Sequence, residues 1–263
     1  MADVYNFTGV SYFVGAKDHW LTGGLLSGGL WTVAFAALAR WLRGVTNAGA
    51  LTGAVSCFIL FLAGGPGAFG ALITVFALAW IATRFGYSRK QKLGIAERRE
   101  GRNASQVIAN LGIATTCAAM YVLAQGHLPG NSARGNAPWL LAMCAALSEA
   151  AADTVSSEVG QALGNRARLV TNWASVPAGT NGAVSLIGSL AGIAAAGIVS
   201  SVCLLGGLLP DRGLGISVGA AVLGMVVDSF LGASLERRQL LGNNSVNFVS
   251  TLSAALSAWL LSP

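Results

Sequence analysis

The apolar residues of this chain form long runs, which clusters of glycine, proline and polar residues interrupt. A run of about 20 apolar residues is long enough to cross a bilayer as an α-helix. We therefore predict an all-α, polytopic transmembrane helical bundle, with a short extracytoplasmic segment of residues 1–19 and one helical domain of residues 20–263. The eight predicted spans are residues 20–39, 48–64, 67–83, 106–125, 137–157, 183–209, 214–231 and 245–261.

The second and third predicted spans are short, and the sequence Gly64-Gly65-Pro66-Gly67 joins them. Glycine and proline interrupt helices, so this junction predicts either a tight hairpin of two helices or a partly re-entrant pair. Seven spans is the alternative count.

Composition supports the membrane assignment. Of the 263 residues, 54% are hydrophobic and only 10% are charged, whereas soluble domains carry roughly 25% charged residues. No charged residue occurs between Arg43 and Arg84, or between Arg168 and Asp211, which leaves uncharged stretches of 40 and 42 residues. Each stretch is long enough for two spans. The 35 glycines suit helices that pack backbone against backbone.

The basic residues indicate an orientation. With eight spans the connecting loops alternate between two faces, and 13 of the 16 Lys and Arg residues fall on one of them. Cytoplasmic loops carry the excess of basic residues, so we expect this face to be cytoplasmic and both termini to lie opposite. The 13 residues are Arg40, Arg43, Arg84, Arg89, Lys90, Lys92, Arg98, Arg99, Arg102, Arg166, Arg168, Arg237 and Arg238.

The sequence predicts neither disulfide-bonded or metal-binding cysteines nor a signal peptide. The four cysteines, Cys57, Cys117, Cys144 and Cys203, occur singly in apolar runs, which predicts small buried residues rather than disulfides or metal ligands. The first 19 residues lack the basic start and apolar core of a signal peptide.

Acidic residues within the predicted spans point to chemistry. Glu149 and Asp153 are four residues apart in the fifth span, so they share one helix face. A carboxylate inside a membrane costs at least about 2.5–3.5 kcal/mol and normally marks a functional site. Asp228 ends the seventh span at the depth expected for Asp153, and Mg²⁺ binds such carboxylates together with phosphate oxygens and waters. Pairing with a loop arginine purely for assembly is the alternative explanation.

A loop before the sixth span could bind phosphate. Pro177, Gly179 and Gly182 interrupt the chain there, Thr180 and Asn181 supply a hydroxyl and an amide, and an uncharged helix follows. Backbone N–H groups at a helix start, reached through glycines, form an anion site. Threonine and asparagine before a helix are also ordinary caps, so capping alone is the alternative.

The long loop of residues 84–105 is strongly basic and either neutralises a polyphosphate or only sets topology and meets anionic headgroups. Gln106 and Asn110, four residues apart, carry two amides on one face into the fourth span, which topology alone does not explain. The candidate phosphate-neutralising residues are Lys92, Arg98, Arg99 and Arg102.

Five segments together resemble the integral-membrane phytyl-phosphate kinase family, which was long known only as a membrane family of unknown function. They are KLG at 92–94, ERREGRNASQVIAN at 97–110, AADTVSSEVG at 151–160, PAGTNGAVSLIG at 177–188 and DSFLGASLERR at 228–238. The resemblance extends in order from Thr46 to Asn247. The chain departs from it at Asn103 and Ala104, where a more basic or glycine-rich pair is expected.

The resemblance implies an Mg²⁺-dependent kinase that transfers a phosphoryl group from CTP, or another nucleoside triphosphate, to a prenyl monophosphate. The acceptor it implies first is phytyl phosphate, whose product feeds tocopherol synthesis. It implies metal-binding and catalytic roles for Asp153, Glu158 and Asp228. The nucleotide-site residues are then Gly179, Thr180, Asn181, Gly182 and Ser185, with Lys92, Arg98, Arg99, Arg102, Gln106 and Asn110.

The expected partners are a prenyl phosphate, a nucleoside triphosphate and the lipid bilayer, with no nucleic acid, and the sequence does not indicate an oligomeric state. The expected location is a bacterial inner membrane or a plastid-type membrane, with the active-site loops in the cytoplasm or stroma. A membrane cytidylyltransferase or a prenol kinase would use the same loops. A small-solute transporter fits less well, because transporters place their sites near mid-membrane on broken helices.

Overall fold

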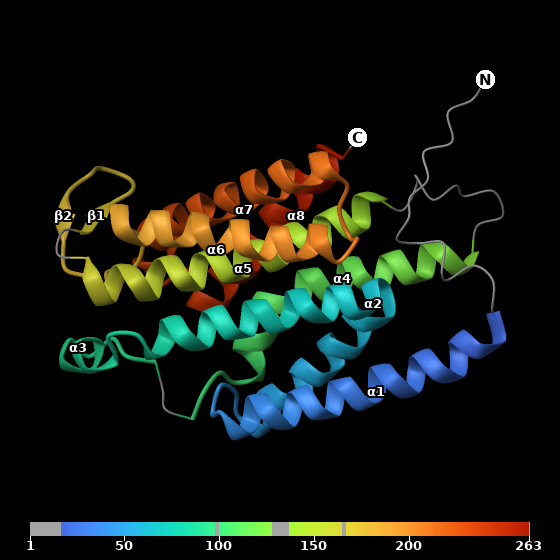
Figure 1. The fold of residues 1–263 in the computed structure, drawn as a ribbon. Helices are drawn as coiled ribbons and strands as arrows, with labels where there is room; N and C mark the ends of the chain where they lie inside the picture. The colour runs from blue at the N-terminus through green and yellow to red at the C-terminus, as the bar shows by residue number, and fades with distance from the viewer. Residues whose placement is uncertain (1–16, 98–99, 128–136, 165–166, 263) are drawn as a thin grey trace.

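The computed structural model describes residues 17–97, 100–127, 137–164 and 167–262, which form a bundle of long helices (Figure 1). The predicted all-α membrane fold is confirmed. The helices are α1 Lys17–Trp41, α2 Asn47–Arg84, α3 Tyr87–Lys92, α4 Ala104–His127, α5 Ala137–Leu163, α6 Leu186–Leu205, α7 Asp211–Leu231 and α8 Asn243–Leu260. A π-helical turn, η3 (Gly232–Glu236), continues α7, and three short strands, β1 Ala167–Leu169, β2 Ser175–Val176 and β3 Ala183–Val184, lie between α5 and α6.

Helix α2 contains both the second and the third predicted spans, and it folds back on itself at Gly65, whose φ of 54° is non-helical. A straight α-helix of its 38 residues would be about 57 Å long. Instead, Trp80 Nε1 near its end donates a hydrogen bond of 3.1 Å to the carbonyl of Leu42, just before its start. Both ends of α2 therefore lie at one end of the bundle (Figure 1), which is the tight hairpin, one of the two arrangements that the glycine–proline junction predicts.

Helix α5 occupies the centre of the bundle and packs against α2, α4, α6, α7 and α8. Its residues 141–152 are all buried, and half of them are alanine. The backbones of α5 and α6 approach each other closely. A Cβ on Gly188 would lie 2.6 Å from the Ser156 carbonyl oxygen, and a Cβ on Gly192 would lie 2.8 Å from the Ala152 carbonyl oxygen. Small residues at helix crossings are how membrane helices gain packing contacts, since lipid provides no hydrophobic drive between them.

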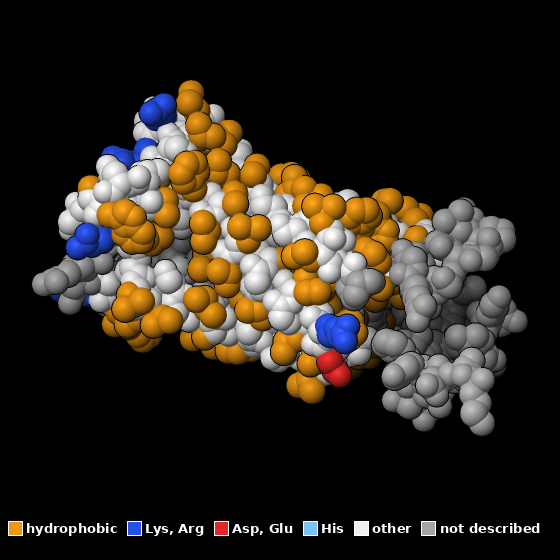
Figure 2. All heavy atoms as spheres, turned by 90° about the horizontal axis from the view of Figure 1, so that it is seen from above, with side chains coloured by type: hydrophobic (Ala, Val, Ile, Leu, Met, Phe, Trp, Pro, Cys, Tyr) orange, Lys and Arg blue, Asp and Glu red, His pale blue; other side chains and the backbone are white. Residues whose placement is uncertain are grey.

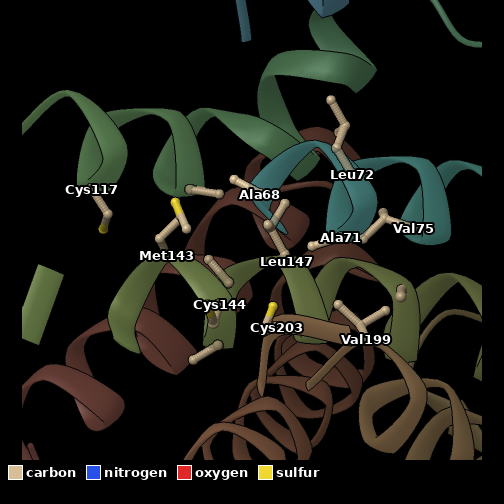
Figure 3. Close-up of a cluster of buried hydrophobic side chains, with 14 of the residues drawn as sticks. Ala68, Ala71, Leu72, Val75, Cys117, Met143, Cys144, Leu147, Val199 and Cys203 are labelled. Carbon is tan, nitrogen blue, oxygen red and sulfur yellow. The ribbon is translucent and has the colours of Figure 1, made fainter. Parts of the chain in front are cut away.

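The main buried cluster contains all four cysteines, which are free and buried. Figure 3 shows Cys144 and Cys203 close to each other, with Cys117 on the opposite side of Met143. The prediction that these thiols are small apolar residues of the core is confirmed. In the described residues they form no disulfide.

The charged loops gather at one end of the bundle. Residues 42–46, 85–97, 100–103, 167–185 and 232–242 lie there and are called the motif end below (Figure 1). On the face drawn in Figure 2, hydrophobic and uncharged side chains cover the middle of the molecule, while Lys and Arg side chains gather mainly at this end. Which compartment the motif end faces stays a prediction.

Four helical stretches are long and apolar enough to cross a membrane: α2, Ala104–Gln125, α6 and Asp211–Glu236. Counting each arm of α2, the described chain runs eight times along the bundle. The predicted count of about eight passes therefore agrees with the structure.

The predicted start of the sixth span at residue 183 is wrong. Ala183 and Val184 form β3, which pairs antiparallel with β1 through Arg168↔Val184, and β1 also pairs with β2. The helix begins at Leu186, after Ser185 as its N-cap. Strands of two or three residues are stabilised by their cross-strand partners. The spacing of apolar residues within such a short segment therefore does not predict them.

Candidate active site

A polar cavity of about 220 Å³ lies at the motif end, between α5, the loop that precedes α6, and the end of α7 with η3. Several sequence motifs that are far apart in the chain meet in its wall. The predicted site residues that line it are Arg102, Asp153, Glu158, Gly179, Thr180, Asn181, Gly182, Ser185 and Asp228.

Two aspartates form the acidic floor of this cavity. The carboxyl groups of Asp153 on α5 and Asp228 on α7 lie close enough to share a hydrogen bond. Glu149, one helical turn deeper, lies in electrostatic range of both. Neither carboxylate oxygen of Glu149, nor Oδ2 of Asp228, has a hydrogen-bond partner in the structure.

Buried carboxylate oxygens without partners are costly unless a cation or a proton compensates them. The arrangement therefore fits a divalent cation held mainly by Asp153 and Asp228. Among the described residues no three His, Cys, Asp or Glu side chains are arranged to hold a metal by themselves. Mg²⁺ commonly takes one or two carboxylates and completes its shell with substrate phosphates and water, so the two aspartates are a sufficient set of protein ligands for it.

Glu236 joins the same cavity, although sequence reasoning did not assign it to the site. It follows Asp228 by eight residues, and such residues point about 80° apart in an uninterrupted α-helix. The π turn, in which the Arg237 N–H bonds to the Gly232 carbonyl oxygen, adds a residue to one turn and brings Glu236 into electrostatic range of Asp228. Single π turns are frequent at functional sites, but they leave no signal in apolar spacing.

The glycine-containing loop fits tightly against its neighbours. Gly182 has a φ of +72°, and a Cβ there would lie 2.1 Å from the backbone nitrogen of Ala233 in η3. A Cβ on Gly179, with a φ of +83°, would lie 2.7 Å from the Ile95 side chain. At Gly182 only glycine satisfies both the backbone conformation and the close approach, whereas a side chain at Gly179 would be strained and would have to displace that of Ile95. The loop is therefore fixed against the element that carries Glu236.

Capping explains part of this loop. The Ser185 hydroxyl accepts a hydrogen bond of 3.2 Å from the Gly188 N–H, and the Thr180 hydroxyl donates one of 2.8 Å to the Pro177 carbonyl. These bonds organise the turn and the start of α6. Both residues also line the cavity, so the capped helix start faces it.

Arg102 is the cationic residue best placed for a phosphate. Its backbone is fixed on both sides, because its N–H bonds to the Gly44 carbonyl and its own carbonyl accepts from the Thr46 N–H, each at 3.0 Å. Its guanidinium group donates a hydrogen bond of 3.2 Å to the Thr154 hydroxyl and lies in electrostatic range of Asp153.

Glu158 lines the cavity but already has a protein partner. Its carboxylate accepts a hydrogen bond from the ammonium group of Lys90, which is fully buried and also donates to the carbonyls of Ala82 and Thr83. Sequence reasoning counted Lys90 only among the topology-setting residues. Its burial depends on α3, a six-residue helix that folds against the end of α2 and has no apolar pattern of its own.

Not every predicted residue reaches the polar cavity. Lys92 is exposed at the end of α3 and does not line the polar cavity. Gln106 and Asn110 line a second cavity instead. Arg98, Arg99 and Arg166 lie outside the described residues, as do residues 1–16 of the predicted N-terminal segment.

The second cavity, of about 340 Å³, is mostly apolar and lies between α1, α2 and the start of α4. Glu97 and Arg102 line both cavities. The Asn247 side-chain amide, in the wall of the polar cavity, donates a 3.5 Å hydrogen bond to the Asn110 side chain, in the wall of the apolar one. The two cavities are thus neighbours that share Arg102.

Comparisons with known proteins show the family. A family model described as integral membrane protein DUF92 matches residues 30–255. Protein VTE6, chloroplastic, from Arabidopsis thaliana is 30% identical over 202 residues, which is 75% of this chain and 59% of that protein. The match thus spans less than two thirds of that relative's length.

Two uncharacterized membrane proteins are also similar. One from Synechocystis sp. is 32% identical over 206 residues, 76% of each chain, and one from Methanocaldococcus jannaschii is 27% identical over 219 residues, 82% of this chain and 85% of the other. No solved structure is significantly similar. Because the family model covers the bundle from α1 to α8 together with both cavities, the chain belongs to the integral membrane protein DUF92 family.

Proposed function

We propose that this protein is a membrane kinase that transfers the terminal phosphoryl group of a nucleoside triphosphate to a prenyl monophosphate. The proposed donor is CTP, and the first acceptor to test is phytyl phosphate, the substrate of the family that the sequence motifs resemble. One observation carries the proposal: a single cavity at the motif end brings together Asp153, Asp228, Arg102 and the glycine-containing loop of residues 179–185.

Phosphoryl transfer requires positioned reactants and compensation of phosphate charge more than it requires covalent chemistry from the protein. In this proposal Arg102 and the backbone of the 179–185 loop bind phosphate oxygens. Asp153 and Asp228 hold Mg²⁺, which supplies charge neutralisation for the phosphates when it is bound. Glu158, paired with Lys90, positions the end of α5 beside the nucleotide.

The bond changes are simple. An oxygen of the acceptor monophosphate forms a bond to the terminal phosphorus of the triphosphate, and the bond from that phosphorus to the bridging oxygen breaks, which releases a nucleoside diphosphate. The acceptor oxygen is already anionic, so no general base has to remove a proton from it. The site lies at the end of the bundle, where a soluble nucleotide and a membrane-anchored phosphate can meet. The excess of basic residues favours the cytoplasmic or stromal face.

The test is an assay of purified protein with Mg²⁺, CTP labelled at the terminal phosphate, and phytyl monophosphate. The proposal expects labelled phytyl diphosphate and CDP, with no labelled product from phytol or phosphatidate. Pyrophosphate release with a CDP-linked lipid would replace the kinase with a cytidylyltransferase, and phosphorylation of phytol would replace it with a prenol kinase. ATP, GTP and UTP in parallel reactions measure the preference for the base.

A further inference from the structure

The apolar cavity between α1, α2 and α4 has the composition of a binding site for a hydrocarbon chain. Its volume of about 340 Å³ lies within the roughly 300–1,000 Å³ of small-molecule pockets. Apolar side chains from all three helices, together with Val45 between α1 and α2, form most of its wall. They are Phe35, Ala36, Ala39, Val45, Ala50, Leu72, Val75, Phe76, Ala79, Val107 and Leu111.

One end of this cavity has a net positive charge. Three arginines, Arg43, Arg84 and Arg102, line it there against one acidic residue, Glu97, which accepts a hydrogen bond from Gln106. The Arg84 guanidinium is held over the ring of Trp80, 4.0 Å from its centroid, and donates a hydrogen bond of 2.6 Å to the Leu42 carbonyl. A pocket with an apolar body and a cationic end fits a ligand with an apolar tail and an anionic head.

The length of the cavity suits a chain rather than a compact solute. Leu72 and Arg84 both line it and are twelve residues apart on the same arm of α2. At 1.5 Å per residue they are separated by about 18 Å along the helix axis. The apolar body therefore continues well below the cationic end, into the depth of the bundle.

The cationic end adjoins the polar cavity, because Glu97 and Arg102 line both. A phosphate bound at Arg102 from the apolar side would face the polar cavity, whose floor is formed by Asp153 and Asp228. Backbone hydrogen bonds with Gly44 and Thr46 hold Arg102 at the boundary between the two cavities.

We propose that the apolar cavity holds the tail of a single-chain isoprenoid monophosphate, with the phosphate at Arg102. This inference rests on the proposed kinase function and names the subsite of its acceptor. The nucleotide then enters from the polar cavity, and the two phosphates meet at the arginine that the cavities share.

The test measures binding directly, without turnover. Purified protein in detergent is equilibrated with labelled geranylgeranyl, farnesyl or geranyl monophosphate, and separately with labelled CTP and Mg²⁺. Gly53 lines the cavity, and a Cβ there would meet no atom within 4 Å. Gly53→Phe should therefore fill the cavity, and Ala36→Leu should narrow it from α1.

The matched control is Gly197→Phe. Gly197 is also a half-buried helical glycine with open space around its Cβ position, but it lies on α6 and lines neither cavity. Loss of contact with about two methylene groups corresponds to roughly tenfold in affinity. Gly53→Phe should weaken geranylgeranyl monophosphate binding by about that factor or more, and weaken geranyl monophosphate binding less. CTP binding should be unchanged, which shows that the variant is folded.

The outcomes separate this inference from the proposed function. If Gly53→Phe and Ala36→Leu bind all three prenyl phosphates as the wild type does, the tail lies elsewhere and the inference is overturned, even if the kinase assay succeeds. Equal affinity for phosphatidate, lost in the same variants, would make the cavity a site for bilayer lipid and also overturns it. Selective loss of long prenyl phosphates supports the subsite, even if the kinase assay yields no transfer.

Discussion

The ammonium group of Lys90 on α3 is fully buried and ion-paired with the carboxylate of Glu158 on α5. The same ammonium donates to the carbonyl oxygens of Ala82 and Thr83 in the last turns of α2. One cation therefore ties three helices together beside the polar cavity and satisfies carbonyls at a helix end, where the helix dipole also favours positive charge.

Replacing Lys90 alone should be strongly destabilising. In Lys90→Met the Glu158 carboxylate, 13% exposed, loses the buried ammonium group with which it is paired. Removing one member of a buried pair typically costs about 3–5 kcal/mol. In the double variant Lys90→Met/Glu158→Gln the uncompensated charge is gone, so much of the loss should be recovered. Unfolding of the detergent-solubilised protein, followed by circular dichroism, measures both.

Lys92→Met is the matched control for this pair, because Lys92 belongs to the same short helix and is exposed. It should change the free energy of unfolding by no more than about 0.5 kcal/mol. A Lys90→Met variant as stable as Lys92→Met would show that the buried pair contributes nothing to the fold.

The contact of Gly182 with Ala233 predicts that the site is intolerant of a single added methyl group. In Gly182→Ala the new Cβ would overlap the backbone of η3, so the loop must move away from the cavity. Nucleotide binding should fall by at least about tenfold, which corresponds to about 1.4 kcal/mol. Equilibrium binding of labelled CTP with Mg²⁺ is the measurement.

Gly94→Ala separates the clash from the backbone conformation. Gly94 has nearly the same φ, +71° against +72°, but its Cβ would meet no atom within 4 Å. This variant should lose only the roughly 1–2 kcal/mol of left-handed strain in stability, with nucleotide affinity retained. Equal losses of affinity in both variants would mean that the approach of the loop to η3 is irrelevant to the site.

The aspartate pair should be essential for turnover. Asp153→Asn and Asp228→Asn each remove a negative charge from the cation site, and losses of roughly 10²–10³ in kcat are typical when one such electrostatic contact is removed. Asp211→Asn, in the exposed first turn of α7 at the opposite end of the bundle, should keep full activity. Full activity in Asp153→Asn would remove that residue from the cation site.

The same asparagine substitutions that lower kcat should raise the stability of the folded protein when no metal is present. Asp153 and Asp228 are close enough to share a hydrogen bond, which requires a proton on one of them. Replacing one carboxyl group by an amide removes the cost of taking up that proton, or of the repulsion without it. Without Mg²⁺, Asp228→Asn should therefore melt at a higher temperature than the wild type. Functional sites commonly carry such a cost in stability.

Mg²⁺ with CTP should reverse that order. A ligand at 100 times its Kd stabilises the folded protein by about 2.7 kcal/mol, and only the wild type keeps both carboxylates. Melting curves with and without Mg²⁺ and CTP make the comparison. The same ligand-induced rise in the wild type and in a double asparagine variant would place the cation elsewhere.

Some of the site follows from the sequence, and particular residues show why. Asp153 and Asp228 could be placed at one depth because each ends an apolar run on the same side of the alternating loops. Glu236 could not be placed, because its position depends on a π turn. The burial of Lys90 depends on how α3 folds back, and the strand at 183–184 depends on a partner at 168–169.

The sequence by itself determined that this is a polytopic helical membrane protein, that the chain is interrupted at residues 64–67, and that its motifs share one end of the bundle. These properties concern only the position of each residue across the membrane. They can be read from the sequence because the free energy of transfer from water to lipid depends on the local stretch of chain. Only the tertiary structure decided which helices are neighbours. It set a polar cavity beside an apolar one with Arg102 in both, because lateral contacts in a bundle depend on side-chain fit between distant segments.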